Sequence, residues 1–464
     1  MQKLYPLAFF LALPSVGAGC AGGDDDDGAE TGFESSGTTG TSFGTAEDGG
    51  DPAACADADA PNVIPTPVPM EITADTTLTC DRVWYLTGTT TVRGATLTLQ
   101  PGTTVFGSAG SALVIEKDAR IHAVGRPDAP IVFTSSNPKG QRARANWGGL
   151  VLLGRALVNA PNGVGQAEGF SSPPSYGGTD PAHDCGTLQY VRVEFAGFEI
   201  VTDNELNGIT FYACGTGTVV DHVQSHMGSD DAFEFFGGGF HATHLVATGM
   251  GDDAIDIDLG FRGSLQYVFV HQDPTLGDGN HALEWSNSPL DFTASPVTSP
   301  WISNLTFIGQ GPAGNAAKSI GFTVKEGAEA HIYNAYFTHA TGPGGTIQDE
   351  QTVALASAGG VVVQGTYFGT HAGFTHAGDA LSWDDATWEA FVLEQDGNAD
   401  DVDLGLNTTW TMPNVQPAPG SPADGTGVAV PAGTPIAPTT YIGAVDPNAT
   451  EDWTRAPWIN YDPN

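Results

Sequence analysis

The chain has 464 residues, of which 62 are glycine and 31 are proline, and its 54 Asp and Glu outnumber its 15 Lys and Arg, for a net charge of −39. This charge argues against nucleic acid or an anionic membrane surface as a partner, because like charges repel, and it favours divalent cations or basic partners. After the N-terminus, no run approaches the roughly 18 apolar residues of a membrane span.

The first residues predict an export signal, because Lys3 precedes an apolar stretch at 4–13 and small residues follow. Residues 16–20, Val-Gly-Ala-Gly-Cys, resemble the lipobox of bacterial lipoproteins, in which the cysteine is lipidated and becomes the first mature residue. Residues 1–19 are therefore expected to be a signal peptide and Cys20 a lipid anchor. The alternative is cleavage by an ordinary signal peptidase. The expected location is the outer membrane or cell surface, with the membrane contacted through this anchor only.

An acidic tether is expected over residues 20–79. Residues 21–60 carry 11 acids and no Lys or Arg, and they are rich in Gly, Ser and Thr. Such a segment buries too little apolar surface to fold, so disorder is predicted. It would hold the folded part away from the bilayer.

Four cysteines remain after Cys20, and an even remainder in an exported protein suggests two disulfides, for which three connectivities exist. Cys185 lies three residues before an expected strand at Leu188, and Cys214 lies five residues before one at Val219. If these strands belong to neighbouring coils, the two cysteines occupy equivalent turns about 5 Å apart, within reach of a disulfide. Cys55 would then pair with Cys80 and fasten the end of the tether to the first strand.

Short apolar strands separated by turn residues are expected from residue 95 onward, first at 95–99, 103–106, 113–115, 120–123, 131–133 and 150–153. Six later segments align as one strand of successive coils. Their shared inward position holds Val191, Val223, Leu245, Val268, Leu305 and Ala335. The spacing between these positions is never below about 22 residues, which is typical of a solenoid of short parallel strands with loops of variable length.

Three further segments, 228–235, 250–257 and 279–285, share the order small residue, apolar, acid, apolar. Strand alternation places the apolar side chains inside, so Glu234, Asp256 and Glu284 are predicted to point outward, one above another, about 4.8 Å apart. Like charges at this spacing repel by roughly 1 kcal/mol in water and by more when buried. With their acidic neighbours they form what we call the acidic cluster: Asp230, Asp231, Glu234, Asp252, Asp253, Asp256, Asp258 and Glu284.

Five segments carry a family resemblance: 94–102, 147–154, 186–197, 229–238 and 441–446, the last followed by Asp452-Trp453. Through them the chain resembles the right-handed parallel β-helices of the pectate-lyase-like fold, and especially exported bacterial β-helix lipoproteins without an established activity. The resemblance implies an all-β solenoid, which is expected over 80–410. The segment 411–464, with Pro-rich residues 412–438 and the closing Trp453 and Trp458, is expected to wrap back over one end of the solenoid as a cap. Residues 384–394 predict one helix with a capping Asp.

The acidic cluster admits three interpretations. Its carboxylates and turn carbonyls could bind Ca²⁺, which takes six to eight oxygen ligands. One acid could instead keep its proton and act as a general acid, or the cluster could be structural, with Asp side chains bonded to turn amides.

The function that this pattern favours is binding or scaffolding at the cell envelope, with a polysaccharide or an envelope protein as candidate partner. The enzymatic alternative is a polysaccharide lyase or hydrolase that uses Asp231, Asp252, Asp253 and Arg262. The Asn-Thr-Asp, Gly-His-Gly and Arg-Ile-Lys motifs of the β-helical hydrolases are absent from the sequence. Fold alone does not establish an activity.

Overall fold

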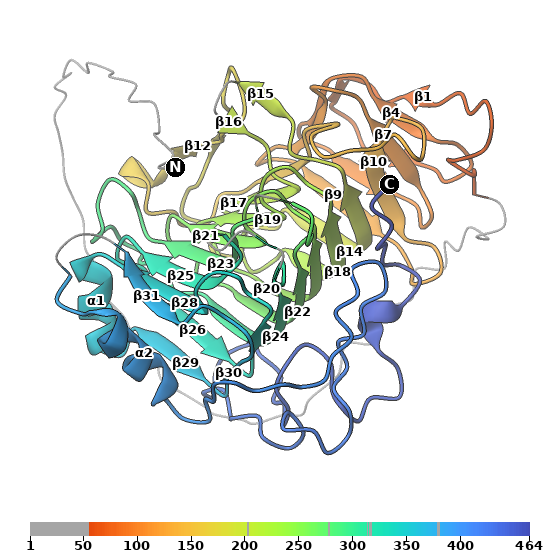
Figure 1. Cartoon of the computed structure of the whole chain (residues 1–464). Coiled ribbons are helices and arrows are strands. Elements are labelled where there is room, and N and C mark those ends of the chain that lie inside the picture. Colours follow the sequence, from red (N-terminus) through yellow and green to blue (C-terminus); the bar gives the residue numbers. More distant parts are fainter. Residues whose placement is uncertain (1–54, 202–203, 277–278, 313, 315–317, 378–380) are drawn as a thin grey trace, which may run out of the picture. The chain divides into compact units, whose positions relative to one another are not determined.

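The computed structural model describes residues 55–201, 204–276, 279–312, 314, 318–377 and 381–464 (Figure 1). The expected signal peptide, the lipidated Cys20 and the tether up to residue 54 lie outside the described residues. Within the described ranges, short parallel strands follow one another along the chain and build two long sheets. This arrangement confirms the predicted all-β class and the parallel β-helix.

In the described residues the larger sheet has 16 strands and the smaller has 11. The main path of the larger sheet is β1 (Thr66–Pro67), β4 (Trp84–Leu86), β7 (Thr104–Gly107), β10 (Ile131–Ser135), β14 (Gly186–Glu194), β18 (Val219–His226), β20 (His241–Thr248), β22 (Ser264–His271), β24 (Trp301–Ile308), β26 (Ala330–Tyr333) and β29 (Val361–Gln364), and it is joined by β3 (Thr76–Leu78), β6 (Thr96–Leu99), β9 (Arg120–Val124), β27 (Tyr336–Thr338) and β30 (Tyr367–Phe368). The smaller sheet is β2 (Glu71–Ile72), β5 (Thr89–Val92), β8 (Ala112–Ile115), β11 (Leu150–Leu153), β17 (Ile209–Tyr212), β19 (Phe233–Phe236), β21 (Ile255–Asp258), β23 (His281–Ser286), β25 (Ile320–Lys325), β28 (Gly345–Gln348) and β31 (Phe374–Ala377). Each coil contributes a strand to both sheets.

The long strands of the larger sheet bend at one residue whose backbone is left-handed. These residues are Tyr190 (φ 49°), His222 (57°), His244 (53°), Tyr267 (61°) and Asn304 (55°). A left-handed backbone conformation is less favourable by roughly 1 kcal/mol or more for a residue that has a Cβ. Because it recurs in successive strands, we expect contacts that offset this free energy. The rings supply them, because the centroid of His222 lies 4.1 Å from that of His244, which lies 4.8 Å from that of Tyr267. These stacked rings therefore contact one another from one coil to the next.

The interior of the coil holds the predicted inward row. Val223 pairs with Leu245, and Leu245 pairs with Val268, on adjacent strands. All three side chains are fully buried in one continuous hydrophobic core. The alternation of apolar and polar residues therefore set the register of these coils, as a period of two requires.

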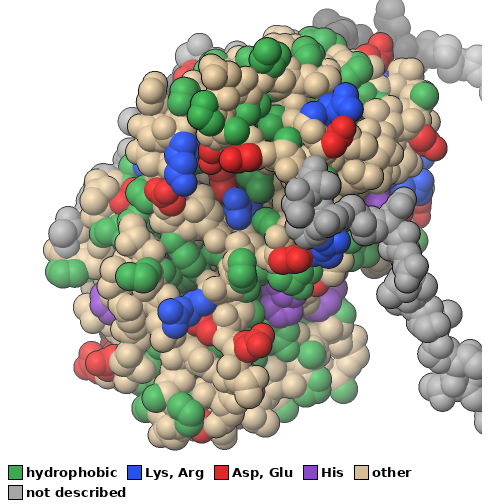
Figure 2. Space-filling view, turned by 90° about the vertical axis from the view of Figure 1, so that its right-hand side faces the viewer, with side chains coloured by type: hydrophobic (Ala, Val, Ile, Leu, Met, Phe, Trp, Pro, Cys, Tyr) green, Lys and Arg blue, Asp and Glu red, His purple; other side chains and the backbone are tan. Residues whose placement is uncertain are grey.

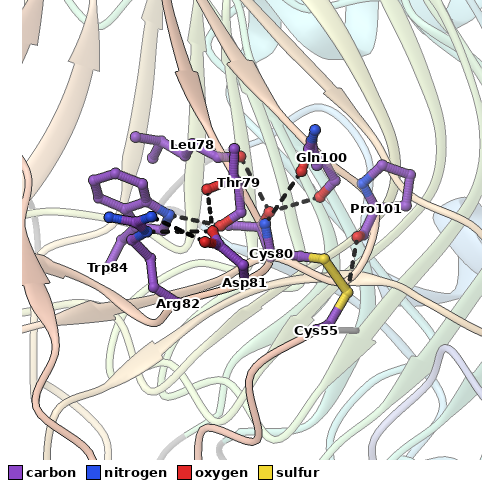
Figure 3. Close-up of a disulfide and its surroundings, with 10 residues drawn as sticks. Cys55, Leu78, Thr79, Cys80, Asp81, Arg82, Trp84, Gln100 and Pro101 are labelled. Atoms are coloured by element: carbon purple, nitrogen blue, oxygen red, sulfur yellow. Dashed lines mark hydrogen bonds and ion pairs between the residues drawn. A yellow bond between two sulfur atoms is a disulfide. The ribbon is translucent and has the colours of Figure 1, made fainter. Parts of the chain in front are cut away.

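Both predicted disulfides are present. Cys185 and Cys214 are joined across neighbouring coils with a Cα–Cα distance of 5.7 Å, and Cys55 is joined to Cys80 with a distance of 4.7 Å. Figure 3 shows the second bridge beside Pro101, whose carbonyl lies 3.6 Å from Cys55 Sγ. The disulfide fixes the chain to the first coils at Cys55. Strands β1 to β3 lie before residue 80, so the β-helix begins earlier in the chain than was expected from the sequence.

Two helices, α1 (Glu350–Ser357) and α2 (Asp385–Leu393), lie beside the last strands of the smaller sheet (Figure 1). The predicted helix is α2, and its predicted cap is Asp384, which accepts a hydrogen bond from the Thr387 amide. Trp388 of α2 is fully buried, and its Nε1 donates to the Gly345 carbonyl. These helices cover the end of the core and protect its strand edge from pairing with other chains.

The C-terminal segment 411–464 was expected to cover the end of the solenoid. The structure instead places this segment along the outer side of the larger sheet. Gln224 of β18 donates to the Asn460 carbonyl, Gln266 of β22 to the Ala437 carbonyl, and Asn304 of β24 to the Tyr441 carbonyl. Trp458 is fully buried against this sheet, in a second cluster with Val246. Hydrogen bonding of the long polar side chains on these strands explains the difference.

An insertion between β11 and β14, residues 155–183, lies against the outer face of the smaller sheet, and we call it the cover segment. It contains the 3-10 turn Pro161–Gly163 and the antiparallel pair β12 (Gly165–Gln166) and β13 (Ser175–Tyr176), and a second such pair, β15 (Glu199–Val201) and β16 (Asn204–Glu205), follows β14. The ring of Tyr176 lies 4.5 Å from that of Tyr212 on β17, within a separate apolar cluster outside the coil.

Candidate functional site

Acidic side chains form a file on the outer face of the smaller sheet. Glu234 on β19 pairs in register with Asp256 on β21, which pairs with Glu284 on β23. The residues on either side, such as Ile255 and Ile257, are fully buried in the core, so the acids point away from it. The predicted file of carboxylates exists.

These acids are nevertheless removed from solvent. The exposed fractions are 1% for Asp231, 3% for Glu234 and 9% for Asp256. The cover segment lies over this region: Leu157 accepts a hydrogen bond from the Gly238 amide, and the Asn159 amide donates to the Leu259 carbonyl. The sequence predicted that the file points outward, but not that another part of the chain covers it.

Asn207, in the turn before β17, connects the cover segment to the file. Its side-chain amide donates to Glu234, to Glu168 of the cover segment at 3.2 Å and to Thr210 at 3.2 Å. Asn207 is 1% exposed, and its Oδ1 atom has no hydrogen-bond partner among the described residues. The amide nitrogen of Asn207 thus contacts two carboxylates, Glu234 of the file and Glu168 of the cover segment.

Two groups of three carboxylates place one oxygen from each member within 4.8 Å of the others: Asp231, Glu234 and Asp256, and Asp230, Asp231 and Asp252. Calcium binds oxygen atoms at about 2.3–2.6 Å, so ligands on opposite sides of one ion lie roughly 5 Å apart. Carboxylate oxygens are the ligands that this hard cation prefers. The residues present therefore fit a calcium ion, with Asp231 shared by both groups.

The next part of the file carries its own counter-charges. Asp253 accepts a hydrogen bond from His281 Nδ1 at 2.8 Å, and Glu284 forms an ion pair with Lys325 of β25 at 2.8 Å. Burial raises the pKa of Asp253 to about 6, against the attraction of His281. Burial acts to lower the pKa of Lys325, but Glu284 and Asp256 hold it above its usual value. Glu284 is therefore neutralised by Lys325, whose charge also acts on Asp256.

Asp258 and Arg262 lie away from the other predicted site residues. Asp258 ends β21, at the opposite end of the strand from Asp252 and Asp253. It is 4% exposed, and burial raises its pKa to about 8, so it keeps its proton at neutral pH. Arg262 follows beyond that end and donates to the Val297 carbonyl. The structure does not bring Arg262 together with Asp252 and Asp253.

Asp221 lies beside the stacked histidines of the larger sheet. Its Oδ1 is 2.8 Å from His222 Nδ1 and 2.9 Å from His244 Nδ1. Although burial acts to raise it, the pKa of Asp221 is held well below its usual range by these rings and by Thr243. Because the two rings are stacked with an interplanar angle of 17°, their in-plane nitrogen lone pairs cannot converge on one ion. This group is a contact between neighbouring coils.

Sequence reasoning missed Asn207, His281 and Lys325 as partners of the acids. His281 and Lys325 had a usable signal, because each belongs to a coil next to the acid that it contacts. Asn207 and Glu168 had no such signal in the sequence, because they lie in irregular segments outside the repeated strands.

Comparison with protein families finds one match: a model described as a pectate-lyase like beta helix domain covers residues 70–412. No curated protein and no solved structure matches the chain. None of the helices in the described ranges is long and apolar enough to cross a bilayer.

Proposed function

Since the chain belongs to the pectate-lyase-like β-helix family, whose fold does not fix an activity, we propose that it is a lipid-anchored binding or scaffolding module of the cell envelope. Its β-helix binds Ca²⁺ at the acidic cluster and presents its surface to a polysaccharide or an envelope protein. The observation that carries this proposal is the burial of the carboxylates, which are 1% exposed at Asp231 and 3% at Glu234.

Burial separates this cluster from the substrate that a polysaccharide lyase or hydrolase must reach. A general acid or base acts within about 3 Å of the reacting atom, directly or through one water molecule. Here the cover segment lies between the file and solvent, fixed by Asn159, which contacts both Leu259 and Asn287. A polymer chain therefore has no direct approach to Glu234 or Asp256, and a stabilising role for these acids is favoured.

Calcium follows from charge and from donor type. Asp231, Glu234 and Asp256 each place one oxygen within 4.8 Å of the others, and among the described residues these three carboxylates are matched by one nearby cation, Lys325, which also pairs with Glu284. Carboxylates in a low-dielectric site repel strongly unless protons or a cation neutralise them. A divalent ion bound there would join β19 and β21 to the turn before β19 and would stabilise consecutive coils.

Export and surface location are supported by the two disulfides, because such bonds persist in oxidising compartments. The expected anchor, Cys20, precedes the described residues. On the face shown in Figure 2, Lys and Arg side chains lie interspersed with Asp and Glu rather than gathered into one basic patch. A mixed polar surface of this kind suits sugar hydroxyls or a protein partner and supports the expectation of no nucleic acid.

The calcium part is tested by thermal melts of the full chain in Ca²⁺ and in chelator. A ligand at 100 times its Kd stabilises the folded form by about 2.7 kcal/mol, so Ca²⁺ should raise the Tm. Mg²⁺ should act more weakly, since it demands a smaller octahedral site. Identical melts in Ca²⁺ and chelator would contradict the metal site.

The choice between binder and enzyme is tested by incubating the chain with a panel of polysaccharides and measuring new reducing ends and unsaturated products. We expect binding on a glycan array or to envelope proteins without turnover. Turnover that Asp253→Asn abolishes would overturn the proposal in favour of a lyase or hydrolase.

A further inference from the structure

A hollow of about 240 Å³ lies between the turn that joins β8 to β9 and the two ends of the cover segment. Lys117 comes from that turn, and Arg120 is the first residue of β9. Arg155 begins the cover segment, and His183 ends it. Small-molecule pockets for drug-sized ligands begin at about 300 Å³, so this hollow suits a smaller molecule. It is separate from the acidic cluster and from every residue discussed above as a candidate site.

Charged side chains of both signs line this hollow: the cations Lys117, Arg120 and Arg155, and the acids Asp118, Asp180 and Asp184. Three of the 15 Lys and Arg residues line the hollow, in a chain whose net charge is −39. Arg120 is paired with Asp184 at 2.8 Å, whereas Lys117 donates a hydrogen bond to a neutral partner, Ser175 Oγ, at 3.0 Å. Arg155 is exposed, and its guanidinium forms no hydrogen bond or ion pair with the described residues. Lys117 and Arg155 therefore form no direct ion pair among the described residues, although Asp118 and Asp180 line the same hollow.

His183 adds a buried polar group to this hollow. It is 7% exposed, and its Nε2 atom has no hydrogen-bond partner in the described ranges. Burial, and then the charge of Arg155, lower the pKa of His183, so its ring is neutral at pH 7. A buried ring nitrogen without a partner costs roughly 1–3 kcal/mol, so a ligand atom that hydrogen-bonds to it is favoured.

We propose that this hollow binds a small hydroxylated oxyanion, a sugar acid or a sugar phosphate. Lys117 and Arg155 contact the oxyanion, because charge-assisted hydrogen bonds from these side chains are the strong ones. His183 Nε2 and the exposed carboxylate of Asp118 bind hydroxyl groups. The inference rests on the proposed function as a binding module, and it names the ligand class and the place of binding.

The test is isothermal titration calorimetry of the full chain with three probes: D-glucuronate, D-glucose 6-phosphate and D-glucose. We expect one site that takes glucuronate, glucose 6-phosphate or both, weakened by added salt, and no heat with glucose. Binding of one anion alone identifies the carboxylate or the phosphate as the source. Binding of neither anion, or equal binding of glucose, would overturn the inference.

The location is tested with Arg155→Gln and Lys117→Gln, each expected to weaken binding roughly tenfold or more while the Tm stays unchanged. Arg455→Gln is the matched control, since Arg455 is also exposed and lies in the C-terminal segment. Unchanged affinity in both test variants would overturn the location. Failure here leaves the calcium melts and the turnover assay unaffected, so it is distinguishable from failure of the proposed function.

Discussion

Asp253 Oδ1 accepts two hydrogen bonds from His281 on the next coil, one from the backbone amide at 2.7 Å and one from Nδ1 at 2.8 Å. One carboxylate thus fixes both the backbone position and the ring orientation of a residue 28 positions further along the chain. Burial raises the pKa of this acid, and the pKa of His281 is also raised, because Asp253 and Glu284 outweigh the effect of burial. Each member of the pair therefore holds its proton to a higher pH in the folded chain than in the unfolded chain.

The first prediction concerns pH. The pKa of Asp258 is about 8 in the folded protein, against about 4 when unfolded. Its contribution to stability is therefore fully present below pH 4 and is lost as the pH rises to 8, by a total on the order of 5 kcal/mol. Asp258→Asn should remove this loss and raise the unfolding free energy at pH 8 much more than at pH 5. Denaturant titrations in chelator at both pH values measure it.

The control for that experiment is Asp396→Asn, an exposed Asp whose side chain makes no hydrogen bond in the described residues. It should leave the pH dependence of stability unchanged. Equal slopes in the wild-type chain and in Asp258→Asn would show that Asp258 is ionised and contacts solvent or a cation.

The second prediction concerns the metal. Asp231 is the residue common to both groups of three carboxylates, so Asp231→Asn should abolish most of the rise in Tm that Ca²⁺ produces. The same change lowers carboxylate repulsion, so the variant in chelator should retain a cooperative melt. Thermal melts with and without Ca²⁺ measure both effects. A calcium response as large as that of the wild-type chain would place the ion elsewhere.

The third prediction concerns the core. Leu245 is fully buried between Val223 and Val268, so Leu245→Ala should lower the unfolding free energy by about 2–5 kcal/mol. Val219, on the strand that pairs with β20, is 48% exposed, and Val219→Ala should change stability by less than about 1 kcal/mol. Urea titration compares the two. Similar losses in both variants would contradict the stacked inward row.

The fourth prediction concerns the bridge between coils. Cys185–Cys214 closes a loop of 29 residues, so replacing both cysteines with Ser should destabilise the chain by about 3.5 kcal/mol through the greater freedom of the unfolded state. Denaturant titration measures the loss, and thiol titration under denaturing conditions confirms which cysteines are paired. A free thiol at Cys185 or Cys214 in the wild-type protein would refute the connectivity.

The coil register followed from the sequence because strand alternation has a period of two. Because Phe233 and Phe235 lie inside the coil, Glu234 between them must point outward. The shortest coil has about 22 residues, so the equivalent acid of the next coil, Asp256, lies beside Glu234. The same reasoning placed Cys185 beside Cys214 and predicted α2 from its cap and apolar spacing. These are local or periodic properties, and each can be derived without knowing how distant segments dock.

Only the tertiary structure decided whether the acids face solvent. Two segments outside the coils have no sequence repeat that fixes their position. In the cover segment, Glu168 accepts a hydrogen bond from Asn207, which also donates to Glu234. In the C-terminal segment, the Asn460 amide donates to Gln224. Their docking depends on side-chain packing and on hydrogen bonds between residues far apart in the chain. The sequence by itself thus determined a β-helix with a file of carboxylates, and the folded insertion determined that this file is buried, because burial depends on which surfaces meet in space.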